Sequence, residues 1–151
     1  MSRTATYHTT VKWKGEHLGH IRMGNGPEMD FSAPPEAEGL PNVLTPEDAF
    51  VAAVNSCIMM MFLWSCERLK ISLLSYECRA EGTELIELDK TETFTQVRLY
   101  PEIIVRAGDE TQANLEKRIQ RALQSAQKYS LVANSIKSEL IIEPMIKIVD
   151  G

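Results

Sequence analysis

Cys57 is the residue whose type and setting best suit covalent chemistry. It lies in an uncharged stretch from Ala49 to Cys66, directly after Asn55 and Ser56. A cysteine in an apolar helix is usually just a small buried side chain. Two polar neighbours are unusual in such a helix, and they indicate a thiol with a function. Because a thiolate is a nucleophile that peroxides oxidise readily, redox chemistry is the chemistry to expect.

The other two cysteines, Cys66 and Cys78, favour structural roles. Cys57 and Cys66 would lie about 13.5 Å apart along one helix axis, which is too far for a disulfide. Cys66 falls near the expected helix end and Cys78 on the apolar face of an expected strand, where free cysteines are commonly buried. An odd number of cysteines without a signal-peptide pattern predicts a reducing, cytoplasmic setting.

A reactive thiolate at Cys57 needs a positive group beside it. Glu47 precedes Cys57 by about 15 Å along a straight helix, so a meeting of the two requires a bent helix, a twofold axis or a relaying cation. The helix dipole gives little help so far from the first turn. The sequence therefore predicts that another segment brings a guanidinium, ammonium or imidazole group to the sulfur.

The helix that carries Cys57 has a clear start. Thr45 is a favourable N-cap, and Pro46 suits the first helical position. Glu47 and Asp48 suit the positive end of the helix dipole. We expect this helix over about residues 46–69.

The uncharged stretch allows two interpretations. It reaches the lower limit of ~17 residues for a transmembrane helix. Asn55, Ser56 and Ser65 interrupt it, however, and the rest of the chain has an ordinary soluble composition. A helix that is apolar on all sides can instead lie at the centre of a protein or a dimer, and we prefer this interpretation, which needs no membrane. Because one chain of this size covers such a helix poorly, we expect an intimate homodimer.

Strands are expected on both sides of this helix. Alternating apolar and polar residues predict strands over residues 4–14, 18–23, 29–31, 73–81, 93–106 and 139–149. The strand over 4–14 should be half-buried, through Ala5, Tyr7, Val11 and Trp13. Gly24-Asn25-Gly26 predicts a hairpin turn, and the proline-rich residues 33–43 predict a loop.

The second half of the chain adds a helix to these strands. An apolar stripe predicts an amphipathic helix from Gly108–Asp109 to Lys128–Tyr129, followed by a short helical turn over 131–136. Gly82 should break or bulge its strand, and Pro101 should mark an edge or a bend. The order of strands, helix, strands, helix and strand predicts a single α+β domain over residues 1–151.

The composition limits the classes of function. The chain has 151 residues, of which 16 are basic and 21 acidic, and its net charge of -5 argues against a nucleic-acid partner. His8, His17 and His20 lack the spacing of metal ligands. The glycines at 24–26 fit a hairpin better than a phosphate-binding loop. We therefore expect no cofactor and no metal.

Several of these features together resemble the OsmC/Ohr family of osmotically inducible proteins and organic hydroperoxide reductases. They are apolar strands with Trp13, a Pro-Glu-Gly loop, a Thr45-Pro46-Glu47-Asp48 helix start, Cys57 in a Pro-Glu-x9-Cys element, and Tyr129-Ser130-Leu131-Val132-Ala133-Asn134-Ser135 after the late helix. The resemblance extends over nearly the whole chain. It implies an intertwined α+β homodimer with its sites at the subunit interface.

The resemblance also implies roles for single residues. Active members use a peroxidatic cysteine, a resolving cysteine on the second helix, an arginine that steadies the thiolate, and a glutamate that orients the arginine. Cys57 matches the peroxidatic cysteine, and Glu47 matches the glutamate. The resolving cysteine would fall at Ser130, whose hydroxyl cannot form a disulfide. Arg22 is the nearest candidate for the arginine.

The implied function is the thiol-dependent reduction of organic hydroperoxides. Cys57 thiolate would attack the outer peroxide oxygen, releasing an alcohol and leaving a sulfenic acid. Because Ser130 cannot resolve this acid, an external thiol reductant is expected, with Cys78 as a weaker internal candidate. The alternative is a non-catalytic member that binds a small apolar ligand at the dimer interface, or one that uses Cys57 as a redox-sensing thiol.

Overall fold

The computed structural model describes residues 1–150 as a mixed α+β fold, as the sequence predicts. Its contacts divide the chain into two compact units, Met1–Phe50 and Val51–Gly151. The elements in chain order are β1 (Thr9–Gly15), β2 (Leu18–Met23), β3 (Glu28–Ser32), the 3-10 helix η1 (Pro35–Ala37), α1 (Pro46–Arg68), β4 (Leu73–Ile86), β5 (Glu92–Arg106), α2 (Gln112–Tyr129), α3 (Leu131–Asn134), β6 (Glu139–Ile142) and β7 (Met145–Val149).

The first unit is built on an antiparallel sheet in the order β1-β2-β3. The predicted turn joins β2 to β3, and Gly26 adopts a positive φ of 118° that favours glycine. β1 begins only at Thr9, and Val11 and Trp13 are 61% and 76% exposed. The prediction of a half-buried strand over residues 4–14 is therefore wrong for the single chain, because the side chains on both faces of β1 are exposed.

The segment between β3 and α1 is irregular apart from η1, which forms one turn within the predicted loop. A bridge between Phe31 and Leu44 returns the chain to the sheet before α1 begins. The Thr45 hydroxyl then accepts a hydrogen bond from the Asp48 backbone N–H at 3.1 Å. This bond satisfies a free donor of the first helical turn and confirms Thr45 as the N-cap.

The second unit contains a sheet in which β5 is central. β4 pairs with β5 in antiparallel fashion, and β6 and β7 pair with its other side in parallel. Pro101 lies in the middle of β5, beyond the residues paired with β6 and before those paired with β7. A residue without an N–H is tolerated there because no strand pairs with it on that side. The predicted closing strand over 139–149 is divided into two strands, β6 and β7, because Glu143 and Pro144 do not pair with β5.

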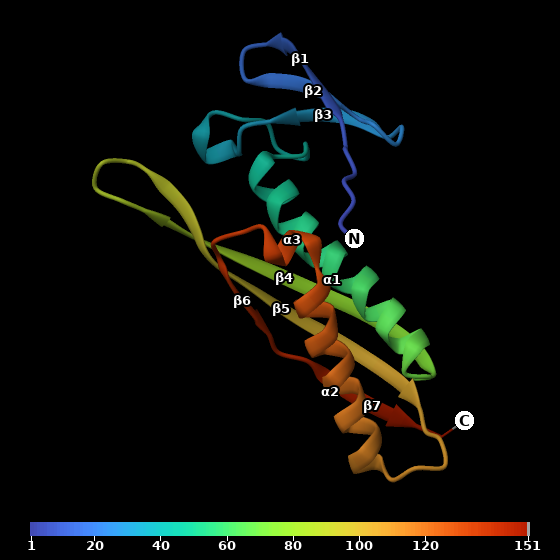
Figure 1. Ribbon diagram of the computed structural model, residues 1–151. Helices are drawn as coiled ribbons and strands as arrows, with labels where there is room; N and C mark the ends of the chain where they lie inside the picture. The colour runs from blue at the N-terminus through green and yellow to red at the C-terminus, as the bar shows by residue number, and fades with distance from the viewer. Residues whose placement is uncertain (151) are drawn as a thin grey trace. The chain divides into compact units, whose positions relative to one another are not determined.

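One face of this sheet carries the core of the second unit. The alternate β5 residues on that face are buried, and the intervening residues are not. α1 contributes Val54, Ile58 and Phe62 to the core, and α2 contributes the whole predicted stripe of Leu115, Ile119, Ala122, Leu123 and Ala126. Figure 1 shows α1 and α2 side by side across this face. The second unit is thus a two-layer sandwich with both helices on one side.

α1 is buried along one side only in the single chain. Ala53, Met60 and Trp64 lie on its free side, with Met60 43% and Trp64 54% exposed. The helix is long and apolar enough to cross a membrane, a test that the core helix of a soluble protein also passes. The cover that the sequence analysis expects for this side, a second copy of the chain, stays a prediction.

Gly82 does not interrupt β4, because it pairs with Val97 and the strand continues to Ile86. A Cβ at this position would approach Val51 Cγ2 to 2.7 Å and the Phe94 ring to 2.9 Å. The reason for glycine is therefore the close approach of α1 and the Phe94 ring. Of the two predicted outcomes, the break is wrong, and a bulge does occur one residue further on, where the register of β4 and β5 shifts between Thr83 and Glu84.

Candidate functional site

Cys57 lies on the side of α1 that faces the end of α2. It is half-buried, and the Ser130 hydroxyl donates a hydrogen bond to its sulfur with an Oγ–Sγ distance of 3.0 Å. Ser130 itself is fully buried. The structure thus brings together the two positions that the resemblance pairs as peroxidatic and resolving, with a hydroxyl where a thiol would stand.

Local structure fixes the direction of the Ser130 hydroxyl. Ser130 is the residue between α2 and α3, and its Oγ accepts a hydrogen bond from the Ala133 backbone N–H at 3.1 Å as the N-cap of α3. Because the oxygen is engaged as an acceptor by the backbone, its single hydrogen is free to point at the Cys57 sulfur. A hydroxyl held in this way can hydrogen-bond to a thiol or to its anion.

The polar residues that first drew attention to Cys57 have structural partners. Asn55 donates from Nδ2 to the Cys78 carbonyl oxygen at 3.1 Å and so ties α1 to β4. The Ser56 hydroxyl donates to the Ala52 carbonyl oxygen of its own helix at 2.7 Å. Neither contact involves the Cys57 sulfur. Cys57 is therefore distinguished as a candidate nucleophile by its contact with Ser130 and by the family resemblance, and not by Asn55 and Ser56.

Cys66 behaves as a structural cysteine. It is buried at the end of α1, and burial, together with the nearby Glu67 carboxylate, raises the pKa of the Cys66 thiol to about 11. A thiol of this kind stays protonated near neutral pH and does not act as a nucleophile.

Cys78 lies on the opposite side of α1 from Cys57. Its carbonyl meets Asn55, which is about 160° around the helix from Cys57. Burial raises the pKa of the Cys78 thiol, with a smaller opposing contribution from Tyr76, and burial raises the pKa of the Tyr76 hydroxyl beyond its ordinary range. This arrangement argues against Cys78 as an internal resolving thiol.

Glu47 lies in the first turn of α1, within the first unit. Its Oε1 is buried without a hydrogen-bond partner, and among the described residues only the Tyr76 hydroxyl shares this condition. A buried carboxylate oxygen without a donor is costly and calls for a partner. Because α1 is one unbroken helix from Pro46 to Arg68, it lacks the bend that would bring this carboxylate directly to Cys57.

The third predicted site residue, Arg22, belongs to β2 of the first unit, where its backbone pairs with Thr10 and Glu28. Its side chain is exposed. Within residues 51–150, no hydrogen bond or ion pair joins a cationic side chain to the Cys57 sulfur. The assignment of Arg22 to the site stays a prediction.

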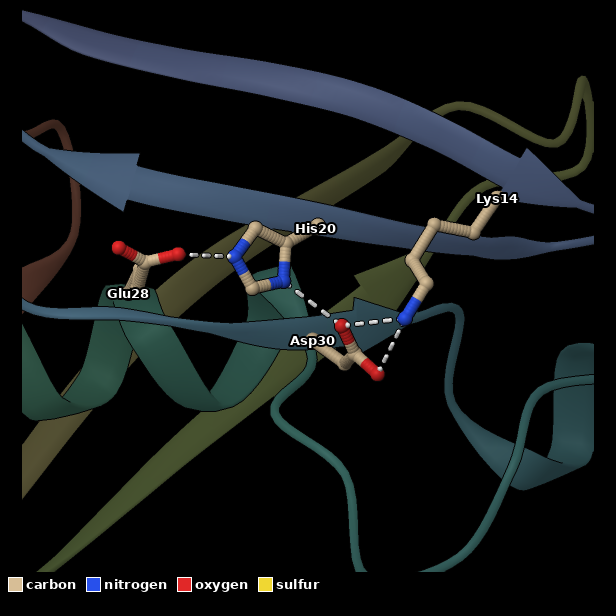
Figure 2. A network of polar contacts seen from close by, with 4 residues as sticks. All are labelled: Lys14, His20, Glu28 and Asp30. Carbon is tan, nitrogen blue, oxygen red and sulfur yellow. Dashed lines mark hydrogen bonds and ion pairs between the residues drawn. The ribbon is translucent and has the colours of Figure 1, made fainter.

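A polar network on the first sheet was not predicted from the sequence, where His20 was weighed only as a metal ligand. Figure 2 shows the His20 ring between Asp30 and Glu28, with Lys14 on the far side of Asp30. The His20 ring nitrogens lie 2.8 Å from Asp30 Oδ1 and 2.9 Å from Glu28 Oε1, and Lys14 Nζ lies 3.0 Å from Asp30. The hairpin register, which pairs His20 with Asp30, is the signal that could have revealed it.

This network changes the titration of its members. Hydrogen bonds to Asp30 and Glu28 raise the pKa of His20, and hydrogen bonds from His20 and Lys14 lower the pKa of Asp30. Within residues 1–150, no group of three or more His, Cys, Asp or Glu side chains is placed to hold a metal ion. The network is therefore an ion-pair cluster that stabilises the hairpin.

Comparison with protein families gives one match. The family model described as OsmC-like protein matches residues 39–144, which include α1, both helices that follow, and the positions of Cys57 and Ser130. No curated protein sequence matches the chain significantly.

Solved structures show the same fold. An OsmC-like protein of unknown function from Vibrio cholerae matches with a TM-score of 0.83 and 21% identity, over 94% of this chain and 100% of that chain. An organic hydroperoxide resistance protein OsmC from Legionella pneumophila gives 0.67 and 18%, over 97% and 99%. The organic hydroperoxide resistance protein OhrB of Bacillus subtilis gives 0.59 and 16%, over 95% and 98%. At these identities the matches establish the fold alone.

Proposed function

The chain belongs to the OsmC-like family, and on that premise we propose that it reduces organic hydroperoxides with Cys57 as the peroxidatic nucleophile. The observation that carries the proposal is the hydrogen bond from Ser130 Oγ to Cys57 Sγ at 3.0 Å. It singles out Cys57 among the three cysteines, since Cys66 is buried and Cys78 faces the other side of α1. Two structural neighbours named as organic hydroperoxide resistance proteins support the same substrate class.

The chemical step balances without any metal or cofactor. The Cys57 thiolate attacks the outer oxygen of the hydroperoxide, an S–O bond forms, and the O–O bond breaks. The alkoxide leaves with a proton from solvent as an alcohol, and the sulfur is oxidised by two electrons to a sulfenic acid. The Ser130 hydroxyl holds the sulfur in place and provides one hydrogen bond to its anion.

Regeneration depends on a second molecule. An external thiol attacks the sulfenic sulfur, releases water and leaves a mixed disulfide, and a second thiol reduces that disulfide and restores Cys57. Ser130 cannot replace the first of these thiols, because a hydroxyl forms no disulfide. We therefore propose a single-cysteine cycle that uses an external thiol in a reducing cytoplasm.

The positive group beside Cys57 completes the proposed site. The buried, unpaired Oε1 of Glu47 supports a role in orienting a cation, because this oxygen needs a donor. We assign that cation to Arg22 on the basis of the family resemblance. We further propose a homodimer in which a second copy covers the free apolar side of α1, where Met60 and Trp64 are exposed.

The decisive experiment follows the thiol itself. The protein is treated with cumene hydroperoxide in the presence of dimedone, and the adduct is located by mass spectrometry while peroxide consumption is measured with an added thiol. We expect one adduct, at Cys57, and turnover that is lost in Cys57→Ser and retained in Cys78→Ser. The absence of both the adduct and peroxide consumption in the native chain would remove the proposal.

One observation favours a second candidate function. No described residue of the second unit provides a cation to the Cys57 sulfur, and the resolving position holds serine. A family member of this kind can bind a small apolar ligand at the dimer interface, or sense oxidants through Cys57, without turning over peroxide. An adduct at Cys57 that forms without sustained peroxide consumption would indicate the sensing role.

A further inference from the structure

Arg22 and Glu28 lie directly opposite each other in the first sheet, yet their side chains do not pair. They are Cα partners in the register of β2 and β3, where side chains of opposite charge attract each other. Instead, Glu28 Oε1 lies 2.9 Å from Nε2 of His20, which is two positions along β2. Within residues 1–150, the exposed Arg22 side chain has no ion pair or hydrogen bond. His20 therefore holds the carboxylate that Arg22 would otherwise attract.

The contacts of His20 require a charged imidazole. Its Nδ1 lies 2.8 Å from Asp30 Oδ1, and its Nε2 lies 2.9 Å from Glu28 Oε1. Both acceptors are carboxylates, so each ring nitrogen must carry a proton, and only the imidazolium has two N–H groups. Figure 2 shows the ring between these two carboxylates. A neutral ring keeps one of the two bonds and turns a lone pair toward the other carboxylate.

Lys14 decides which of the two bonds the neutral ring keeps. Its Nζ lies 3.0 Å from both carboxylate oxygens of Asp30, so Asp30 stays beside Nδ1 when His20 gives up a proton to solvent. Among residues 1–150, Glu28 has no second partner of this kind, and its side chain is 55% exposed. The remaining proton therefore stays on Nδ1, and Glu28 is the carboxylate that is released.

The other charges near His20 do not compete with Arg22 for the released carboxylate. In the first unit, strand alternation places these titratable or charged residues along this face, with the first of them just before β1: His8, Lys12, Lys14, His20, Arg22, Glu28 and Asp30. Lys12 lies opposite His20 on β1, on the far side of β2 from β3, and Lys14 is engaged by Asp30. Arg22 is the cation directly opposite Glu28.

We propose that Glu28 exchanges partners: charged His20 holds it, and after His20 loses its proton Glu28 pairs with Arg22. The consequence for Cys57 rests on the proposed function, in which Arg22 is the cation beside the sulfur. An Arg22 engaged by Glu28 is withheld from Cys57, so the thiolate loses a stabilising charge. His20 is thus a positioning residue for Arg22.

The direction of the pH dependence follows from the contacts of His20. Hydrogen bonds to Asp30 and Glu28 raise the pKa of His20. Below the raised value the imidazolium holds Glu28, and Arg22 is available. As the pH rises through that value, Glu28 is released and Arg22 is withdrawn.

The exchange is measured on Arg22 itself. Nuclear magnetic resonance titration of the full chain follows the Arg22 Cζ signal from about pH 5.5 to about pH 8.5, on both sides of the ordinary histidine pKa of about 6.5. We expect an inflection at the pKa of His20 in the native chain, and none in Glu28→Gln or His20→Gln. His8→Gln removes another imidazole from this part of the sheet and should keep the inflection. If His20→Gln does not fold, Glu28→Gln at its exposed position carries the same test.

The consequence for Cys57 is measured as the rate of its alkylation by iodoacetamide, which needs no peroxide turnover. Thiolate formation alone raises this rate with pH, so Glu28→Gln and the native chain are compared at the same pH. We expect equal rates at about pH 5.5, where His20 holds Glu28, and a rate about threefold higher in Glu28→Gln at about pH 8.5. Glu36→Gln removes the same charge from an exposed position in η1 and should match the native chain at both pH values.

Two results would overturn the proposal. They are an Arg22 signal without an inflection at the pKa of His20, and an inflection that persists in Glu28→Gln and so reports the His20 charge alone. An Arg22 signal that follows His20, together with an alkylation ratio that does not change with pH, would support the exchange and contradict the assignment of Arg22 to Cys57. Absence of peroxide consumption, with both of these measurements as expected, would contradict the proposed function alone.

Discussion

The hydroxyl of Ser130 lies 3.0 Å from the sulfur of Cys57, although the two residues are far apart in the sequence. The contact joins the middle of α1 to the turn between α2 and α3. It places a serine where the family resemblance expects a second thiol.

Replacing Ser130 with cysteine should provide the missing thiol. Because the side chains of Ser130 and Cys57 already touch, we expect Ser130→Cys to form an intramolecular disulfide with Cys57 after one equivalent of hydroperoxide. Mass spectrometry of the non-reduced protein should find the linked peptides and the loss of two hydrogens per chain. Ser135→Cys, at an exposed position just beyond α3, should form no such link and provides the control.

Ser130→Ala should lower stability and change the reactivity of Cys57. The variant loses both the N-cap of α3 and a buried hydrogen bond to the sulfur, so we expect a loss of about 1–2 kcal/mol in the free energy of unfolding. The rate of Cys57 alkylation by iodoacetamide should fall, since the anionic sulfur loses a donor.

The matched control is Ser135→Ala, whose hydroxyl donates to the Leu131 carbonyl oxygen on the exposed side of α3. Its unfolding free energy should stay within about 0.5 kcal/mol of the native value. Unchanged alkylation in Ser130→Ala, measured across the pH range, would contradict a role for this hydroxyl at the sulfur.

Gly82→Ala should destabilise the packing of α1 on the sheet. Its Cβ would approach Val51 Cγ2 to 2.7 Å and the Phe94 ring to 2.9 Å, so both neighbours must move. We expect a loss of about 1–3 kcal/mol by thermal or urea unfolding. Gly108→Ala is the control, because its Cβ would meet nothing within 4 Å and should be neutral or mildly stabilising. Equal stability of the two variants would refute the packing explanation for Gly82.

The network around His20 should make the first sheet sensitive to pH. Because Asp30 and Glu28 raise the pKa of His20 above its ordinary value of 6.5, its contribution to stability is complete below that pH and is lost as pH rises through the raised value. The lowered pKa of Asp30 has the opposite sign, so its contribution is present above 3.8 and is lost as pH falls through the lowered value.

Nuclear magnetic resonance titration of the His20 imidazole measures its raised pKa directly. The His20 signal should titrate above 6.5 in the native chain, and its pKa should fall in Asp30→Asn. His17, which is exposed and lies 3.9 Å from Glu38, serves as an internal reference. A His20 signal that titrates identically in the native chain and in Asp30→Asn would show that the contact does not persist in solution.

Much of the fold could be predicted because its signals are local. The Thr45-Pro46 start of α1 and the apolar stripe of α2 depend on helix capping and on a 3.6-residue period, which short stretches of sequence encode. The wrong predictions concern residues whose surroundings are set by segments far away in the sequence. Gly82 pairs with Val97 inside β4 and is glycine because Val51 and Phe94 approach it, and Pro101 lies inside a central strand because β6 and β7 leave it unpaired on their side.

In the candidate site, too, the local features could be predicted and the contacts between distant residues could not. The sequence by itself determined the family resemblance, the helix around Cys57 and the absence of a thiol at Ser130, since these depend on residue type and order. Only the tertiary structure decided which side chain touches the Cys57 sulfur and which of the other cysteines is buried. The physical reason is that hydrogen bonds, burial and ion pairing act over a few ångströms in space, and the packing of helices on the sheet brings distant residues within that range.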